Sequence, residues 1–200
     1  MKVYFTSDMH FNHTNIIFYA NRPFFKGEDI INEEVVFLTY EIKKSRVEWM
    51  NEVLINNWNS IVNEDDLVYH LGDFCFKGTR GVSKQLENKL NGDIVHIKGN
   101  HDGNNGVKTY INSAFMKFGG KSIYAVHIPP RNIDEIPSGI DFVICGHVHD
   151  EWKHKVINEI PIINVGTDVW NYEPVSTNSL LKYYGLIKKG LVNEQGVKMI

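Results

Sequence analysis

Short polar motifs rich in Asp, Asn and His recur along this 200-residue sequence, and each of them follows a short apolar run. Carboxylate, amide and imidazole groups are the ligands that Mn, Fe, Zn and Ni ions accept in catalytic sites. Seven such groups are too many for one four-coordinate ion, and they suit two ions that share a carboxylate. The seven candidate ligands are Asp8, His10, Asp73, Asn100, His127, His147 and His149.

Each motif alone has an ordinary explanation. Asp-x-His at residues 8–10 and Gly-Asp at 72–73 are frequent in turns, and Gly-His-x-His at 146–149 could be a pair of surface histidines. The sequence Gly-Asn-His-Asp at 99–102 is more specific, because turn chemistry does not require a histidine. The argument for one site therefore rests on all the motifs occurring together, each after an apolar run.

The apolar runs that precede the motifs are four or five residues long and rich in Val, Ile, Tyr and Phe, which favours buried strands. They are Lys2–Phe5, Leu67–Leu71, Ile94–Ile97, Ser122–Val126 and Phe142–Cys145. Helix-like segments alternate with them and predict an α/β fold. Ligands of such sheets bind beyond the carboxyl ends of the strands, where these motifs lie.

The helices predicted from periodicity and end signals are Thr14–Tyr19, a long stretch within Asp29–Ile61, Ser83–Leu90 and Ser176–Lys189. Lys153–Ile157 and Ile160–Val165 are predicted to form two further strands. Without a repeat or a linker, residues 1–200 are expected to form a single domain.

Composition excludes few classes. A formal charge of −3 argues against bulk attraction to nucleic acid or an anionic membrane, although nucleic acid is not excluded. The start of the chain lacks the long apolar core of a signal peptide, so a cytoplasmic location with no membrane partner is expected. Cys75 and Cys145 are expected to be reduced; a thiolate ligand is less favoured than a buried, inert thiol.

The motifs in this order resemble those of the calcineurin-like metallophosphoesterases, and more narrowly a small group of bacterial and phage members. The matching stretches are DMHFNHTNII at 8–17, NRPF at 21–24, NWN at 57–59, YHLGDF at 69–74 and NVGTDVWNYEPVS at 164–176. The resemblance implies a β-sandwich flanked by helices, with a dimetal site at the carboxyl ends of its strands.

The resemblance also implies roles. Asp8, His10 and His149 would bind a first metal, with Asp73 bridging to a second that Asn100, His127 and His147 complete. A metal-bridging hydroxide would attack a phosphomonoester or phosphodiester in line. His101 would assist the leaving oxygen and Asp102 would orient His101.

This sequence departs from the family pattern in two places. His127 is followed by Ile128-Pro129-Pro130 where relatives usually have glycine. The stretch between NRPF and NWN is longer than in the relatives, which suggests a helical elaboration around residues 28–48. We expect residues near Glu33–Arg46 to form a lid or an oligomer contact.

Further candidates for substrate contacts are His13, Arg22, Arg80 and Arg131, which follow metal motifs along the chain. For His13 the alternative is a helix-capping or packing role, and for the arginines it is a solvated position in a loop. His70 and His96 are expected to pack in the sheet, and His154 to lie on the surface.

The expected function is hydrolysis of a phosphoester, and nucleotides are among the candidate substrates. The alternatives are a binding or scaffold module with this fold, or a nuclease. The oligomeric state is left open by the sequence.

Overall fold

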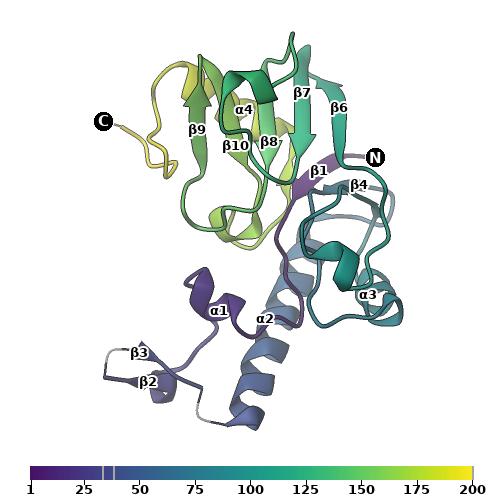
Figure 1. The fold of residues 1–200 in the computed structure, drawn as a ribbon, viewed down its shortest axis with the longest axis vertical. Coiled ribbons are helices and arrows are strands. Elements are labelled where there is room, and N and C mark those ends of the chain that lie inside the picture. The colour runs from purple at the N-terminus through teal and green to yellow at the C-terminus, as the bar shows by residue number, and fades with distance from the viewer. Residues whose placement is uncertain (33, 38, 200) are drawn as a thin grey trace.

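The computed structural model describes residues 1–32, 34–37 and 39–199. Two sheets carry the fold, and the central strands of each are parallel (Figure 1). In the first sheet, the order is β11–β1–β4–β5. Its strands are β1 (Val3–Thr6), β4 (Leu67–His70), β5 (Asp93–His96) and the antiparallel edge strand β11 (Val175–Ser176).

The second sheet has the order β6–β7–β8–β10–β9. Strands β7 (Lys121–Val126), β8 (Phe142–Cys145) and β10 (Ile160–Asn164) are parallel, while β6 (Ser113–Phe118) and β9 (His154–Ile157) are antiparallel edges. The turn between β9 and β10 consists of Asn158 and Glu159, both with positive φ.

One buried apolar cluster joins the two sheets. Phe5 of β1 contributes from the first sheet, and Phe142 and Ile163 contribute from the second. Helix α4 (Thr177–Lys188) adds Leu180 to the same cluster, and the Ser176 hydroxyl caps the helix by accepting from the Ser179 N–H at 3.2 Å. The predicted sandwich is confirmed.

A second cluster covers the outer face of the first sheet. Helix α2 (Tyr40–Ile61) places Met50, Leu54 and Trp58 there. These residues are four positions apart, so their side chains lie on one face of the helix. The short helices α1 (Ile16–Tyr19) and α3 (Arg80–Glu87) contribute Ile16 and Leu86 to the same layer. The expected flanking helices are therefore present.

The prediction of a helical elaboration over residues 28–48 needs correction. The segment instead contains a 3-10 turn η1 (Gly27–Asp29), a small hairpin β2 (Ile30–Ile31) and β3 (Glu34–Val35), and the first turns of α2. Glu33 lies outside the described residues. Buried Arg46 of α2 holds the base of the hairpin, because its Nε lies 2.6 Å from Asp29 Oδ2. A lid or oligomer role stays a prediction.

Three further 3-10 turns follow: η2 (Asp102–Asn104), η3 (Ile133–Glu135) and η4 (Thr167–Val169). Of these, η2 and η4 lie in segments that follow parallel strands, and they carry Asp102 and Asp168. Both residues contact the candidate site. No helix within the described residues is long and apolar enough to cross a membrane.

Candidate metal centre

The seven candidate ligands follow the carboxyl ends of parallel strands in both sheets. Four of them follow strands of the first sheet: Asp8 and His10 after β1, Asp73 after β4 and Asn100 after β5. The other three, His127, His147 and His149, follow β7 and β8 of the second sheet. The site therefore forms where the ends of the two sheets meet.

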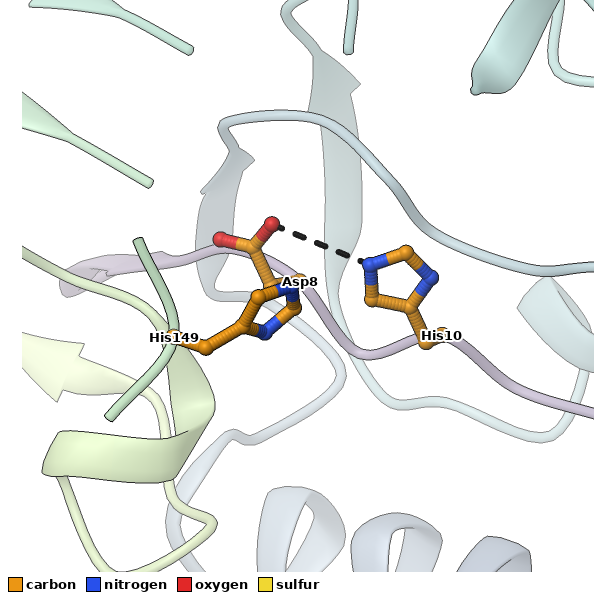
Figure 2. Close-up of side chains that lie close together, drawn as sticks. All are labelled: Asp8, His10 and His149. Atoms are coloured by element: carbon orange, nitrogen blue, oxygen red, sulfur yellow. Dashed lines mark ion pairs between the residues drawn. The ribbon is translucent and has the colours of Figure 1, made fainter. Parts of the chain in front are cut away.

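Two groups of donor atoms share Asp8. Asp8, His10 and His149 offer ligand atoms that all lie within 4.8 Å of one another, and so do Asp8, Asp73 and His127. Figure 2 shows the first group, with the Asp8 carboxylate 3.9 Å from His10 Nε2. Between the groups, Asp73 Oδ2 lies 3.6 Å from His10 Nε2 and 3.4 Å from His127 Nε2. A carboxylate in that position suits a shared ligand.

Several atoms of these groups are buried without a partner. Asp8 Oδ1 and both ring nitrogens of His10 form no hydrogen bond with any described residue. Burial raises the pKa of the Asp8 carboxyl, although neighbouring imidazoles counteract it, and lowers the pKa of His10 well below its usual value. Buried polar atoms without partners are destabilising. A divalent cation would satisfy them, so the residues fit a metal.

Backbone strain marks the same residues. Asp8, His10, Asp73, His147 and His149 all have φ between +47° and +73°, a region that non-glycine residues rarely adopt. Such conformations persist only where the surrounding structure enforces them, and they concentrate at functional sites. Five of the seven candidate ligands are therefore held in orientation by a strained backbone conformation.

Glycine is required at two points beside the ligands. A Cβ at Gly99 would collide with the backbone nitrogen and the carboxylate of Asp73. A Cβ at Gly146 would collide with the side chains of Ser7 and Asp8. The chain segments approach each other so closely here that no larger residue fits.

Asn100 connects two histidines of the second sheet. Its Oδ1 lies 2.9 Å from His127 Nε2 and 3.0 Å from His147 Nδ1. The other ring nitrogen of His127, Nδ1, donates to the Leu71 carbonyl at 2.7 Å, which directs Nε2 toward Asp73 and Asn100. Metal-binding histidines are commonly oriented by such a bond from the second nitrogen.

Asp73 and His127 perturb each other. Burial alone would raise the pKa of Asp73 and lower that of His127. Their mutual contact outweighs burial: it holds the pKa of Asp73 below its usual range and raises the pKa of His127 to about 9. In the metal-free chain a proton on His127 thus supplies positive charge. Metal binding would displace this proton, as is usual for imidazole ligands.

His101 lies beside the donor groups and faces solvent. Its side chain is 48% exposed, and Nε2 lies 4.0 Å from Asp73 Oδ2. Its ring lies edge-on to His10, with centroids 5.8 Å apart. The position leaves the ring accessible to a substrate at the centre.

The expected role of Asp102 needs correction. Its buried carboxylate accepts backbone N–H groups of Asp73, Phe74 and Gly99, at 3.1, 3.1 and 2.7 Å. No hydrogen bond joins it to the His101 ring within the described part of the chain. Asp102 therefore fastens the loop after β4 to the loop after β5 and does not orient His101.

The prediction that Arg22 contacts the substrate also needs correction. Its side chain is fully buried, and Nε donates to Asp168 Oδ1 at 2.7 Å. The guanidinium also donates to the carbonyls of Asp8 and Met9, at 2.6 and 2.9 Å. Arg22 therefore positions the first metal motif and is not free to bind phosphate.

Sequence reasoning missed Asp168 as a member of the site. Its Oδ2 accepts from His149 Nδ1 at 3.0 Å, which leaves His149 Nε2 for a metal. Asn164 supports the same loop, because its amide donates to the His149 carbonyl at 2.9 Å. The available signal was the stretch NVGTDVWNYEPVS, which contains both residues and carries part of the family resemblance.

The remaining substrate candidates lie apart from one another. The half-buried ring of His13 stacks on Phe76 with centroids 3.9 Å apart and lies 5.2 Å from the ring of His10. Burial lowers the pKa of His13 to about 4. Arg80 is exposed at the start of α3, and no contact joins it to the candidate ligands within the described residues. Arg131 lines a pocket beside His147.

Three other histidines and both cysteines lie outside the donor groups. His70 is buried and His96 partly buried in the first sheet, and His96 Nε2 lies 3.1 Å from Glu87 Oε1. The surface position expected for His154 is wrong: it is buried, and its Nδ1 lies 3.0 Å from the Tyr183 hydroxyl. Cys75 and Cys145 are buried free thiols, and burial raises the pKa of Cys75 to about 12.

Comparison with known proteins identifies the superfamily. The sequence profile of the calcineurin-like phosphoesterase superfamily domain matches residues 51–181. An uncharacterized protein of Methanocaldococcus jannaschii is 36% identical over 195 residues, which are 96% of this chain and 94% of that protein. The chain therefore belongs to the calcineurin-like phosphoesterase superfamily, whose members generally bind divalent metals.

Solved structures share the fold. A protein of unknown function from Aquifex aeolicus has a TM-score of 0.62 and 23% identity, covering 90% of this chain and 98% of that one. Vps29 from Entamoeba histolytica, complexed with Zn²⁺, has a TM-score of 0.43 and 15% identity, covering 83% and 74% of the two chains. The latter similarity is too low to support an argument. A narrower relation to bacterial and phage members stays a prediction.

Proposed function

We propose that the protein is a metal-dependent phosphohydrolase that binds two divalent ions and cleaves phosphomonoesters or phosphodiesters. The observation that carries this proposal is the position of Asp73 Oδ2 between His10 Nε2, at 3.6 Å, and His127 Nε2, at 3.4 Å, with an accessible His101 beside them. Superfamily membership supports the same reaction class.

The first ion would be held by Asp8, His10 and His149, and the second by Asn100, His127 and His147, with Asp73 serving both. Mn, Fe, Zn and Ni all accept such mixed oxygen and imidazole ligands. Bound there, the ions would lower the pKa of water to roughly 7 and neutralise charge on the phosphate oxygens.

His101 would protonate or stabilise the departing oxygen. Imidazole is the side chain best able to carry a proton near neutral pH, and this one is half-exposed at the rim of the donor groups. Its backbone N–H donates to Asp73 Oδ1 at 2.9 Å, which ties its position to that of the shared carboxylate. Leaving-group assistance needs this fixed placement.

The test is to remove metals with a chelator, restore Mn²⁺, Ni²⁺ or Zn²⁺ separately, and assay p-nitrophenyl phosphate and its bis ester. Metal analysis of the same samples shows whether two ions bind per chain. We expect turnover that depends on added metal. If both ions bind and neither ester nor a nucleotide panel is hydrolysed, the protein is a binding module and the enzyme proposal is wrong.

A further inference from the structure

A pocket of about 580 Å³ opens beside the candidate metal centre, on the outer face of the second sheet. One wall is the loop Ile128–Arg131, which directly follows the candidate ligand His127. Another wall is the strand β9, with Lys155 and Ile157, and His147 lies at the edge shared with the metal centre. The volume is typical of sites for small organic molecules.

The loop wall is built from residues that do not bend easily. Pro129 and Pro130 each have φ fixed by the ring, so the segment after His127 is stiff without further contacts. Ile128 on this wall is 48% exposed. On the β9 side, Ile157 faces the pocket together with Lys155, because alternate residues of a strand point to the same face of the sheet.

Charged groups surround the apolar walls. Arg131 and Lys155 line the pocket, and neither forms an ion pair with a carboxylate among the described residues. Lys155 Nζ lies 5.2 Å from the centre of the Trp152 ring, which holds the ammonium near the pocket. Glu151 and Glu194 add two carboxylates to the lining.

We propose that this pocket binds the nucleoside part of a nucleotide ester whose reacting phosphate occupies the metal centre. The inference rests on the proposed function. Apolar walls suit a base, the carboxylates accept from its ring N–H or from sugar hydroxyls, and the two cations attract the anionic ester. A nucleotide offers these four charged groups a phosphate, hydroxyls and base N–H groups as partners, and an aliphatic lipid chain offers them none.

The experiment uses three esters that share the p-nitrophenolate leaving group and differ in the retained group: methyl, p-nitrophenyl and thymidine 5′. Because the leaving group is constant, differences in kcat/KM report contacts with the retained group. We expect the thymidine ester to exceed the methyl ester by about tenfold, the size of one or two good polar contacts.

Variants of residues that line the pocket test whether the pocket produces the preference for the thymidine ester. Lys155→Glu and Ile157→Asp should each lower the ratio of kcat/KM for the thymidine and methyl esters by about fivefold or more. The matched control is Lys117→Glu, because Lys117 is an exposed lysine on β6, the opposite edge strand of the same sheet. It should leave the ratio unchanged. Equal ratios in the three variants and the wild type would overturn the inference, as would a thymidine ester that is hydrolysed no faster than the methyl ester.

Calorimetry tests the pocket independently of turnover. Thymidine 5′-monophosphate should bind the metal-loaded protein about tenfold more tightly than inorganic phosphate, and Lys155→Glu should remove that advantage. If no ester is hydrolysed but this binding difference is seen, the proposed reaction fails and the pocket stands. If all three esters are hydrolysed equally and both anions bind alike, the reaction stands and the pocket inference is wrong.

Discussion

Arg22 and Asp168 form a buried ion pair with a distance of 2.7 Å between Nε and Oδ1, although 146 positions separate them in the sequence. Each member of the pair also forms a hydrogen bond with a candidate ligand. Arg22 donates to the Asp8 carbonyl at 2.6 Å, and Asp168 accepts from His149 Nδ1 at 3.0 Å. Loops from the two sheets are therefore aligned by one pair of charges.

Replacing Asp168 by Asn should damage both stability and metal binding. The change leaves the buried Arg22 charge without its counterion, which typically costs about 3–5 kcal/mol. Asparagine keeps only one accepting oxygen, for which Arg22 and His149 Nδ1 must compete, so His149 is oriented less well and metal affinity should fall by about 10–100-fold. Urea unfolding and metal titration measure the two effects.

The matched control for that change is Asp141→Asn. Asp141 pairs with Lys121 at 2.9 Å, but the two side chains are 30% and 39% exposed. Solvent weakens such pairs, so the loss in free energy of unfolding should stay below about 1 kcal/mol, with metal affinity unchanged. Similar losses in both variants would contradict a special role for the buried pair.

His101→Ala should keep its metals and lose rate selectively. General acid assistance matters most when the leaving oxygen is strongly basic, so turnover of an alkyl phosphate should fall by about 10²–10⁴-fold. Turnover of p-nitrophenyl phosphate should fall much less. Metal analysis checks occupancy, and equal losses on the two substrates would argue against the proton-donating role.

Gly99→Ala should displace the shared carboxylate. The added Cβ would lie 2.9 Å from Asp73 Cγ and closer still to other Asp73 atoms, so the loops must separate, at a cost of about 1–3 kcal/mol. We expect loss of bound metal and of activity. Gly103→Ala is the control in the same segment, because its Cβ meets nothing within 4 Å. If the Gly99→Ala variant keeps its metal content, the close approach of residue 99 to Asp73 is not required for metal binding.

Stability should fall at mildly acidic pH because of His154. Burial lowers the pKa of this ring from its usual value of 6.5 in the folded state. The unfolded chain therefore takes up the proton first as pH falls through 6.5, and unfolding is favoured until the folded pKa is passed. The contribution is fully present above pH 6.5 and declines below it.

Urea unfolding at pH 7.5 and pH 5.5 measures this effect. Wild type and His154→Gln share every other titrating group, so the difference between them isolates His154. The wild type should lose more stability on acidification than the variant. An equal or greater loss in His154→Gln would show that another group is responsible.

Much of the fold could be predicted because its central strands are continuous apolar runs. All four residues of β8 are buried, and a segment of that kind is recognised from composition alone. The edge strand β6 was missed because it alternates between exposed and partly buried positions. Two-residue strands such as β2 and β11 are too short to leave any periodic signal.

The candidate ligands were predictable because metal-binding residue types stand in fixed order after the strands. The supporting residues were not. Arg22 was interpreted as a phosphate contact because an isolated arginine near a motif gives no sign that a carboxylate 146 positions away will neutralise it. His154 was assigned to the surface for the same reason, since its partner Tyr183 lies in a different element.

Loops after strands of both sheets contribute to the centre: the first sheet, which contains β1, provides four candidate ligands, and the second sheet provides three. An ion bound there would link the loops of the two sheets. Activity and the stability of this end of the sandwich would then depend on the same metal–ligand bonds. In molecules without metal, the two sheets would then separate more readily at this end, and proteases would cut these molecules sooner. Turnover of the protein would in this way remove the metal-free, inactive molecules before the active ones.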